Sequence, residues 1–145
     1  MSARPKLPIV ARTLLGLGFT VFGANFFLNF LPSPPPSPEF GAFAGALFAG
    51  KIFLVVKLIE VASGLLLLGN RFVPLALTLL APIEVGILTT HLRYAPEGIL
   101  PGAILTALTI YLAWAYRSAF APMLRAHVEP DAASEAAPAR RALTV

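Results

Sequence analysis

The sequence predicts an all-α membrane protein, folded as a bundle of four transmembrane helices with a short interfacial helix between the first and second spans. The first observation is composition: 57% of the 145 residues are hydrophobic and 12% are charged, against about 45–50% and about 25% in soluble domains. The second is that four apolar stretches approach the roughly 20 residues needed to cross a bilayer. Because the hydrocarbon core offers the backbone no water, each span must be a helix.

The four spans are expected at about residues 9–31, 52–69, 72–92 and 99–120, within a single membrane domain of residues 1–125. The first is not a convincing cleaved signal peptide, since it carries two asparagines, runs too long and lacks a clear small-residue cleavage site. The turn "GNRF" joins the second and third spans, with Gly69 ending one helix and Pro74 just inside the next. The segment "RYAPEGILPG", rich in proline and glycine, separates the third and fourth.

The connection between the first two spans has two parts. Five of the ten residues in "LPSPPPSPEF" are proline, so this segment, residues 31–40, is expected to be extended; we call it the proline loop. The next segment, "GAFAGALFAGK", is too short to span and is expected to lie in the interface or against the bundle. Residues 126–145, rich in alanine, proline and charge, are expected to form a disordered cytoplasmic tail.

The basic residues predict the orientation of the chain. Of the eleven lysines and arginines, Lys51 and Arg93 flank one membrane face and Lys57 lies within a span. The other eight flank the opposite face: Arg4, Lys6, Arg12, Arg71, Arg117, Arg125, Arg140 and Arg141. Both termini are therefore expected in the cytoplasm, with the proline loop outside. The net charge of +4 favours topology signals and anionic lipid over nucleic acid.

Six polar residues in the spans are candidates for a ligand or proton site: Asn25, Asn29, Lys57, Glu60, Glu84 and His91. Lys57 and Glu60 are three apart and share a helix face, so they are expected to pair. At about 1.5 Å per residue, the six residues reach similar depths on three helices, from the centre to the outer edge of the bilayer. The sequence therefore predicts one polar cluster in the outer half of the bundle, in which Lys57 faces Glu60 or Glu84.

The same residues also have structural interpretations. The Lys57–Glu60 pair is either an ion pair that fixes helix packing, a ligand or proton site, or a contact for a second protein. The two asparagines are either hydrogen bonders between helices or ligand contacts. His91 is interpreted as a hydrogen bonder rather than a metal or haem ligand, and no metal site, phosphate loop or nucleophile triad is recognised in the sequence.

Three segments together resemble a known family. "ARTLLGLGFTVFGANFFLNFLP", "KLIEVASGLLLLGNRFVPLALTLLAPIEVGIL" and "YLAWAYRSAF" are similar to the DoxX family of small four-span bacterial membrane proteins, over about residues 9–125. The resemblance implies the four-helix fold and a location in the cytoplasmic (inner) membrane of a bacterium. It also implies a link to thiosulfate oxidation and quinone reduction, as in the first-described members, or to oxidative-stress complexes or chaperone-like roles, as in relatives. The lack of cysteine argues against direct sulfur transfer.

Two classes of function follow. The first is a subunit of a redox-linked membrane system, whose polar pocket holds a quinone headgroup or a small anion; Lys57 would supply positive charge, the asparagines hydrogen bonds, and Glu60 or Glu84 a proton. It would be at most an accessory oxidoreductase subunit, since no self-contained catalytic motif or cofactor motif is present. The second is a non-enzymatic scaffold or accessory subunit that docks another membrane protein or a second copy. A cavity beside the charged residues distinguishes the two classes.

Overall fold

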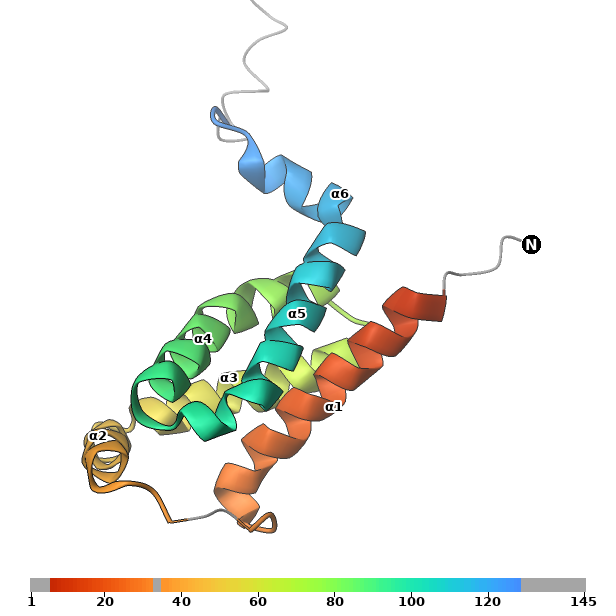
Figure 1. Ribbon diagram of the computed structural model, residues 1–145. Helices are drawn as coiled ribbons and strands as arrows, with labels where there is room; N and C mark the ends of the chain where they lie inside the picture. The colour runs from red at the N-terminus through yellow and green to blue at the C-terminus, as the bar shows by residue number, and fades with distance from the viewer. Residues whose placement is uncertain (1–5, 33–34, 129–145) are drawn as a thin grey trace, which may run out of the picture.

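The computed structural model describes residues 6–32 and 35–128, and every regular element in these ranges is a helix (Figure 1). Five longer helices are present: α1 (Lys6–Leu28), α2 (Pro38–Ala49), α3 (Ile52–Leu68), α4 (Val73–Tyr94) and α5 (Ile99–Ala115). Three short elements complete the set: the 3-10 turns η1 (Pro96–Gly98) and η2 (Ala121–Leu124), and α6 (Arg117–Phe120). The all-helical fold predicted from the sequence is confirmed for the described residues.

Helices α1, α3, α4 and α5 pack around a shared core (Figure 1). Helix α1 contacts α3 most extensively and also contacts α5, while α4 packs between α3 and α5. Helix α2 lies beside the end of the bundle where α3 begins and α4 ends. The core is formed by nine buried apolar side chains, namely Ala11, Leu15, Phe19, Leu67, Val73, Ala76, Leu77, Leu80 and Leu112.

Three helical segments are long and apolar enough to cross a membrane: Lys6–Leu28, Val73–Tyr94 and Pro96–Ala115. They correspond to the first, third and fourth expected spans. Helix α3, which corresponds to the second, has 17 residues and is shorter than these three. Large apolar side chains are exposed along all four bundle helices. The described part of the chain is thus all-helical, with three helices compatible with a membrane; the second expected span, which corresponds to α3, remains a prediction.

The helix boundaries differ from the expected ones for local reasons. Helix α1 ends at Leu28 because Asn29 adopts a left-handed conformation with φ of 48°, which stops the helical hydrogen-bond series. Helix α2 begins inside the segment expected to be extended, since Ser37 accepts a hydrogen bond from the Phe40 backbone and Pro38 starts the helix. The expected span 99–120 is interrupted at Tyr116, after which α6 begins.

The C-terminal tail was expected over residues 126–145. Of these, residues 126–128 are described and carry no helix. Residues 129–145 lie outside the described residues, so the expectation of a disordered tail remains a prediction.

Helices α1 and α3 approach each other closely at two glycines. A Cβ atom built on Gly64 would lie 2.9 Å from the carbonyl oxygen of Gly16 and would also meet Thr20. A Cβ atom on Gly16 would lie 3.0 Å from the carbonyl oxygen of Gly64. The two backbones therefore touch directly, as small residues allow in membrane helix pairs.

We predict that Gly64→Ala destabilises the protein, by about 1–3 kcal/mol, because the added methyl group must push α1 away from α3. The matched control is Gly86→Ala on α4, where an added Cβ meets no atom within 4 Å. Both changes raise helix propensity equally, so only the clash differs. Thermal melting in detergent measures the effect, and equal melting temperatures for the two variants would contradict the close contact.

Candidate functional site

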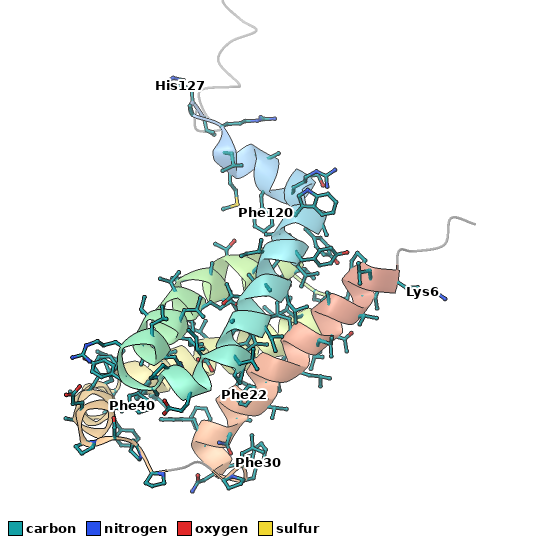
Figure 2. All side chains as sticks on the ribbon, viewed as in Figure 1. Lys6, Phe22, Phe30, Phe40, Phe120 and His127 are labelled. Atoms are coloured by element: carbon teal, nitrogen blue, oxygen red, sulfur yellow. The ribbon has the colours of Figure 1, made fainter. Side chains whose placement is uncertain are left out.

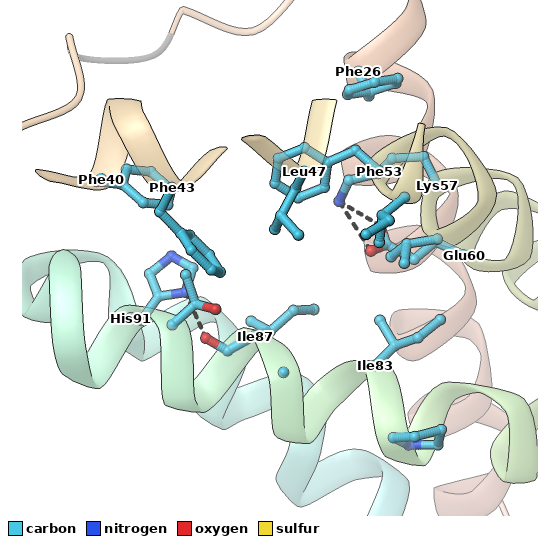
Figure 3. A pocket seen from close by; sticks show the side chains of 15 residues that line it. Phe26, Phe40, Phe43, Leu47, Phe53, Lys57, Glu60, Ile83, Ile87 and His91 are labelled. Atoms are coloured by element: carbon cyan, nitrogen blue, oxygen red, sulfur yellow. Dashed lines mark hydrogen bonds and ion pairs between the residues drawn. The ribbon is translucent and has the colours of Figure 1, made fainter. Parts of the chain in front are cut away.

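Helix α3 places a lysine and a glutamate on the inner side of the bundle (Figure 3). The Lys57 Nζ atom lies 2.9 Å from Oε1 and 2.8 Å from Oε2 of Glu60. The Glu60 side chain is 2% exposed and the Lys57 side chain is 21% exposed. The pairing expected from their spacing is confirmed, and Lys57 takes Glu60 rather than Glu84 as its partner.

A cavity of about 500 Å³ adjoins this ion pair (Figure 3). Its walls come from α2, α3 and α4, with one side chain from α1. Most of the lining is aromatic or aliphatic, and few of the residues are polar. The full lining is Phe26, Phe40, Phe43, Leu47, Ile52, Phe53, Val56, Lys57, Glu60, Pro82, Ile83, Gly86, Ile87, Thr90 and His91. This combination of apolar walls and a small number of converging polar groups is typical of small-molecule sites.

A second cavity, of about 300 Å³, also borders the pair. Four residues line both cavities: Lys57, Glu60, Ile87 and His91. The rest of its lining comes from α1, η1 and α5, namely Phe19, Phe22, Gly98, Pro101, Gly102 and Leu105. The ion pair and the histidine therefore lie between two hollows and border both.

His91 is held by its own helix. Its Nδ1 atom lies 2.9 Å from the carbonyl oxygen of Ile87. Because a carbonyl only accepts hydrogen bonds, Nδ1 must carry a proton, and Nε2 is the acceptor in the neutral ring. A Cβ atom on Gly98 would lie 3.2 Å from Nε2, so the glycine leaves room beside this nitrogen. Within the described ranges, no three histidine or acidic residues lie together as metal ligands.

Glu84 lies elsewhere. The Thr109 hydroxyl of α5 donates a hydrogen bond of 2.6 Å to Oε1 of Glu84. Glu84 is 3% exposed and Thr109 is 6% exposed, and neither lines either of the two cavities. Glu84 therefore links α4 to α5, and Lys57 is not its partner.

The two asparagines serve the end of α1. The Asn25 Oδ1 atom accepts a hydrogen bond of 2.7 Å from the Leu31 backbone, and the Asn29 backbone donates to the Asn25 carbonyl at 2.8 Å. Neither residue lines the two cavities. Of the six candidates, the structure thus brings Lys57, Glu60 and His91 together, whereas Asn25, Asn29 and Glu84 make separate contacts.

The wall contributed by α2 was not expected from the sequence. Phe40, Phe43 and Leu47 recur at helical spacing and face the cavity (Figure 3). The rings of Phe43 and Tyr94 stack at 5.0 Å between centroids, which holds α2 against the end of α4. The apolar stripe in "FGAFAGALF" is the signal that could have identified this wall, because its spacing places the three side chains on one face.

The geometry of Arg93 also ties α2 to α4. Its Nη1 atom lies 3.4 Å from Oε2 of Glu39 on α2, and its guanidinium lies 5.0 Å from the centre of the Tyr94 ring. Both partners in the ion pair are well exposed, so the contact adds little stability by itself. It joins two helices that both line the cavity.

No protein-family model, curated protein or solved structure matches the chain.

We predict that Lys57→Met destabilises the protein far more than Glu84→Gln. Removing Lys57 leaves the buried Glu60 carboxylate without its cation, a loss of about 3–5 kcal/mol in comparable buried pairs. Glutamine at position 84 keeps an oxygen that accepts the Thr109 hydrogen bond. The double variant Lys57→Met/Glu60→Gln is the control, and it should recover much of the lost stability. Melting in detergent measures all three, and the reverse order of severity would refute the assignment.

Proposed function

We propose that this chain is a DoxX-like integral membrane protein that acts as a subunit of a redox-linked membrane system, in quinone or oxidative-stress chemistry. In this proposal the cavity beside Lys57 and Glu60 binds a quinone headgroup or a small polar ligand. The observation that carries it is the cavity of about 500 Å³ bordered by a buried ion pair. A purely structural pair would be expected to be packed on all sides.

The cavity has the properties of a site for an amphipathic molecule. Its volume falls in the range of about 300–1,000 Å³ that is usual for ligand pockets. The Lys57 ammonium has three N–H donors, of which Glu60 takes two. The third donor can then bind a carbonyl oxygen, and Nε2 of His91 is an acceptor when the ring is neutral. The aromatic side chains Phe26, Phe43 and Phe53 offer stacking surfaces to a flat ring.

The residues present fit binding better than catalysis. Lys57 would position a ligand oxygen, and the apolar walls would exclude water from the ring. A quinone would supply the redox chemistry, and the electrons would come from a partner protein. In this proposal the chain contributes a site and an orientation, as an accessory subunit does.

We also propose that α3 crosses the membrane as the second of four spans and that α2 lies at the outer interface. At about 1.5 Å per residue the 17 residues of α3 extend about 25 Å, slightly less than a hydrocarbon core of about 30 Å. Its packing against both α1 and α4 supports this arrangement. With the distribution of basic residues, it supports cytoplasmic termini in a bacterial inner membrane.

The alternative proposal is a non-enzymatic scaffold or accessory subunit of a larger membrane complex. It is favoured by the structural use of other polar groups, since Glu84 links two helices and Asn25 caps one. Under this alternative the partner is another membrane protein or a second copy of the chain. The first proposal requires a quinone or another small ligand in the cavity, whereas the scaffold requires none.

We predict that Gly86→Leu lowers quinone binding at least about tenfold. Gly86 lines the cavity and has open space around its Cβ position, so a leucine there fills the site without a clash at its Cβ. The matched control is Val85→Leu, on the neighbouring position, whose side chain is 62% exposed and does not line either cavity. Quinone retained after gentle-detergent purification is measured by mass spectrometry. Loss of quinone in neither variant, or in both equally, would favour the scaffold.

We predict that a cysteine introduced at Pro35 reacts with a membrane-impermeant thiol reagent added from outside the cell. The chain has no cysteine of its own, so labelling reports this site alone. Ala126→Cys is the reciprocal control, which should react only after the membrane is opened. Labelling of position 35 from the cytoplasmic side only would rule out the proposed topology.

A further inference from the structure

The two ends of the bundle differ in charge. We call the basic end the end of the bundle where α1 begins, the turn joins α3 to α4, and α5 ends (Figure 1). The described charged residues at this end are all positive: Lys6, Arg12, Arg71, Arg117 and Arg125. The opposite end carries both signs: Glu39, Lys51, Arg93 and Glu97. Figure 2 shows Lys6 and Phe120 toward the basic end, and Phe30 and Phe40 toward the other.

Arg12 distinguishes the basic end from a merely charged surface. It is 9% exposed, and its Nη1 atom donates a hydrogen bond of 2.9 Å to the Leu67 carbonyl oxygen. Among the described residues, no carboxylate lies within 4.0 Å of it. A guanidinium carries five N–H donors, and the structure gives a partner to one of the two terminal nitrogens. Its remaining nitrogens are not fully enclosed, so an acceptor or counter-charge from outside the bundle can reach this largely buried cation.

The Leu67 carbonyl places Arg12 beside the turn between α3 and α4. The same oxygen accepts a hydrogen bond of 3.1 Å from the Asn70 backbone, and the next residue is Arg71, which is exposed. The Leu67 carbonyl lies at the C-terminal end of α3, which is negative and so accounts for one donor of Arg12. The remaining donors and Arg71 lie at the same end of the bundle.

An arginine and a tryptophan occupy the end of α5. The Arg117 guanidinium lies 5.0 Å from the Trp114 ring, and its Nη1 atom donates to the Trp114 carbonyl oxygen at 3.1 Å. The Trp114 side chain is 63% exposed. An exposed tryptophan beside a basic residue is typical of the headgroup level of a bilayer.

We propose that the basic end is a binding site for the phosphate of an anionic phospholipid, with Arg12 as its central ligand and Arg71, Lys6 and Arg117 around it. Guanidinium groups match the geometry of phosphate oxygens, and the phosphate supplies the charge that the described chain does not offer Arg12. Trp114, which is exposed on α5 beside Arg117, would lie at the headgroup level. This site is separate from the cavity beside Lys57.

The test uses the full chain in detergent with one added lipid at a time, phosphatidylglycerol or phosphatidylcholine with the same acyl chains. Native mass spectrometry counts retained lipid, and thermal melting gives the stabilisation by each lipid. The intact protein should prefer phosphatidylglycerol, and Arg12→Gln should weaken that preference about fivefold, as expected for one arginine near an anionic headgroup. Arg93→Gln, which removes one positive charge from the opposite end, is the matched control and should leave the preference unchanged.

A purely structural role for Arg12 gives a different pattern. In that case Arg12→Gln would lower the melting temperature equally with either lipid, and the proposal would be overturned. An equal loss of the phosphatidylglycerol preference in Arg93→Gln would mean that overall charge, and not this site, determines the preference, and it would also overturn the proposal. If inorganic phosphate stabilised the protein as much as phosphatidylglycerol does, the ligand would be a soluble anion and not a lipid. That result would also overturn the proposal.

Discussion

The bundle is organised around a lysine and a glutamate that belong to the same turn of the same helix. Glu60 is 1% exposed, and a carboxylate that is ionised in so buried a position requires a cation at its side. Because Lys57 and Glu60 share one helix face, that whole face of α3 must point into the protein. Helices α1 and α4 then cover it, and α5 closes the bundle between them. The outward face of α3 remains apolar.

The close contact between α1 and α3 follows from the same constraint. Ser63 and Gly64 lie one turn beyond Glu60 and are buried with it. A helix that presents glycine to its neighbour allows the backbones to touch, and the polar groups near the contact are then shielded from lipid. The cavity forms where this tight packing stops, toward the end of the bundle that α2 overlaps. There the polar pair faces aromatic side chains instead of a backbone.

The sequence predicted the helices and the Lys57–Glu60 pair, because apolar length and spacing of three are local properties. It placed Glu84 at a similar depth, as the alternative partner of Lys57, and did not predict the hydrogen bond from Thr109. Glu84 and His91 lie on the same face of α4, seven residues or about 10 Å apart, and the deeper position meets Thr109 of α5 rather than the cavity. The partner depends on how α4 and α5 pack. The α2 wall was missed for the same reason, since an apolar stripe does not identify the surface it will cover.

The strongest helix contact in the bundle joins two helices that are not neighbours in the chain. The proline loop and α2 lie between α1 and α3. During synthesis α1 is therefore complete well before its partner exists, with Gly16 and the guanidinium of Arg12 uncovered. The Leu67 carbonyl that receives Arg12 arrives near the end of α3. Assembly of the α1–α3 contact must then wait for a distant segment, and a chain that ends before Leu67 lacks the carbonyl that accepts from Arg12.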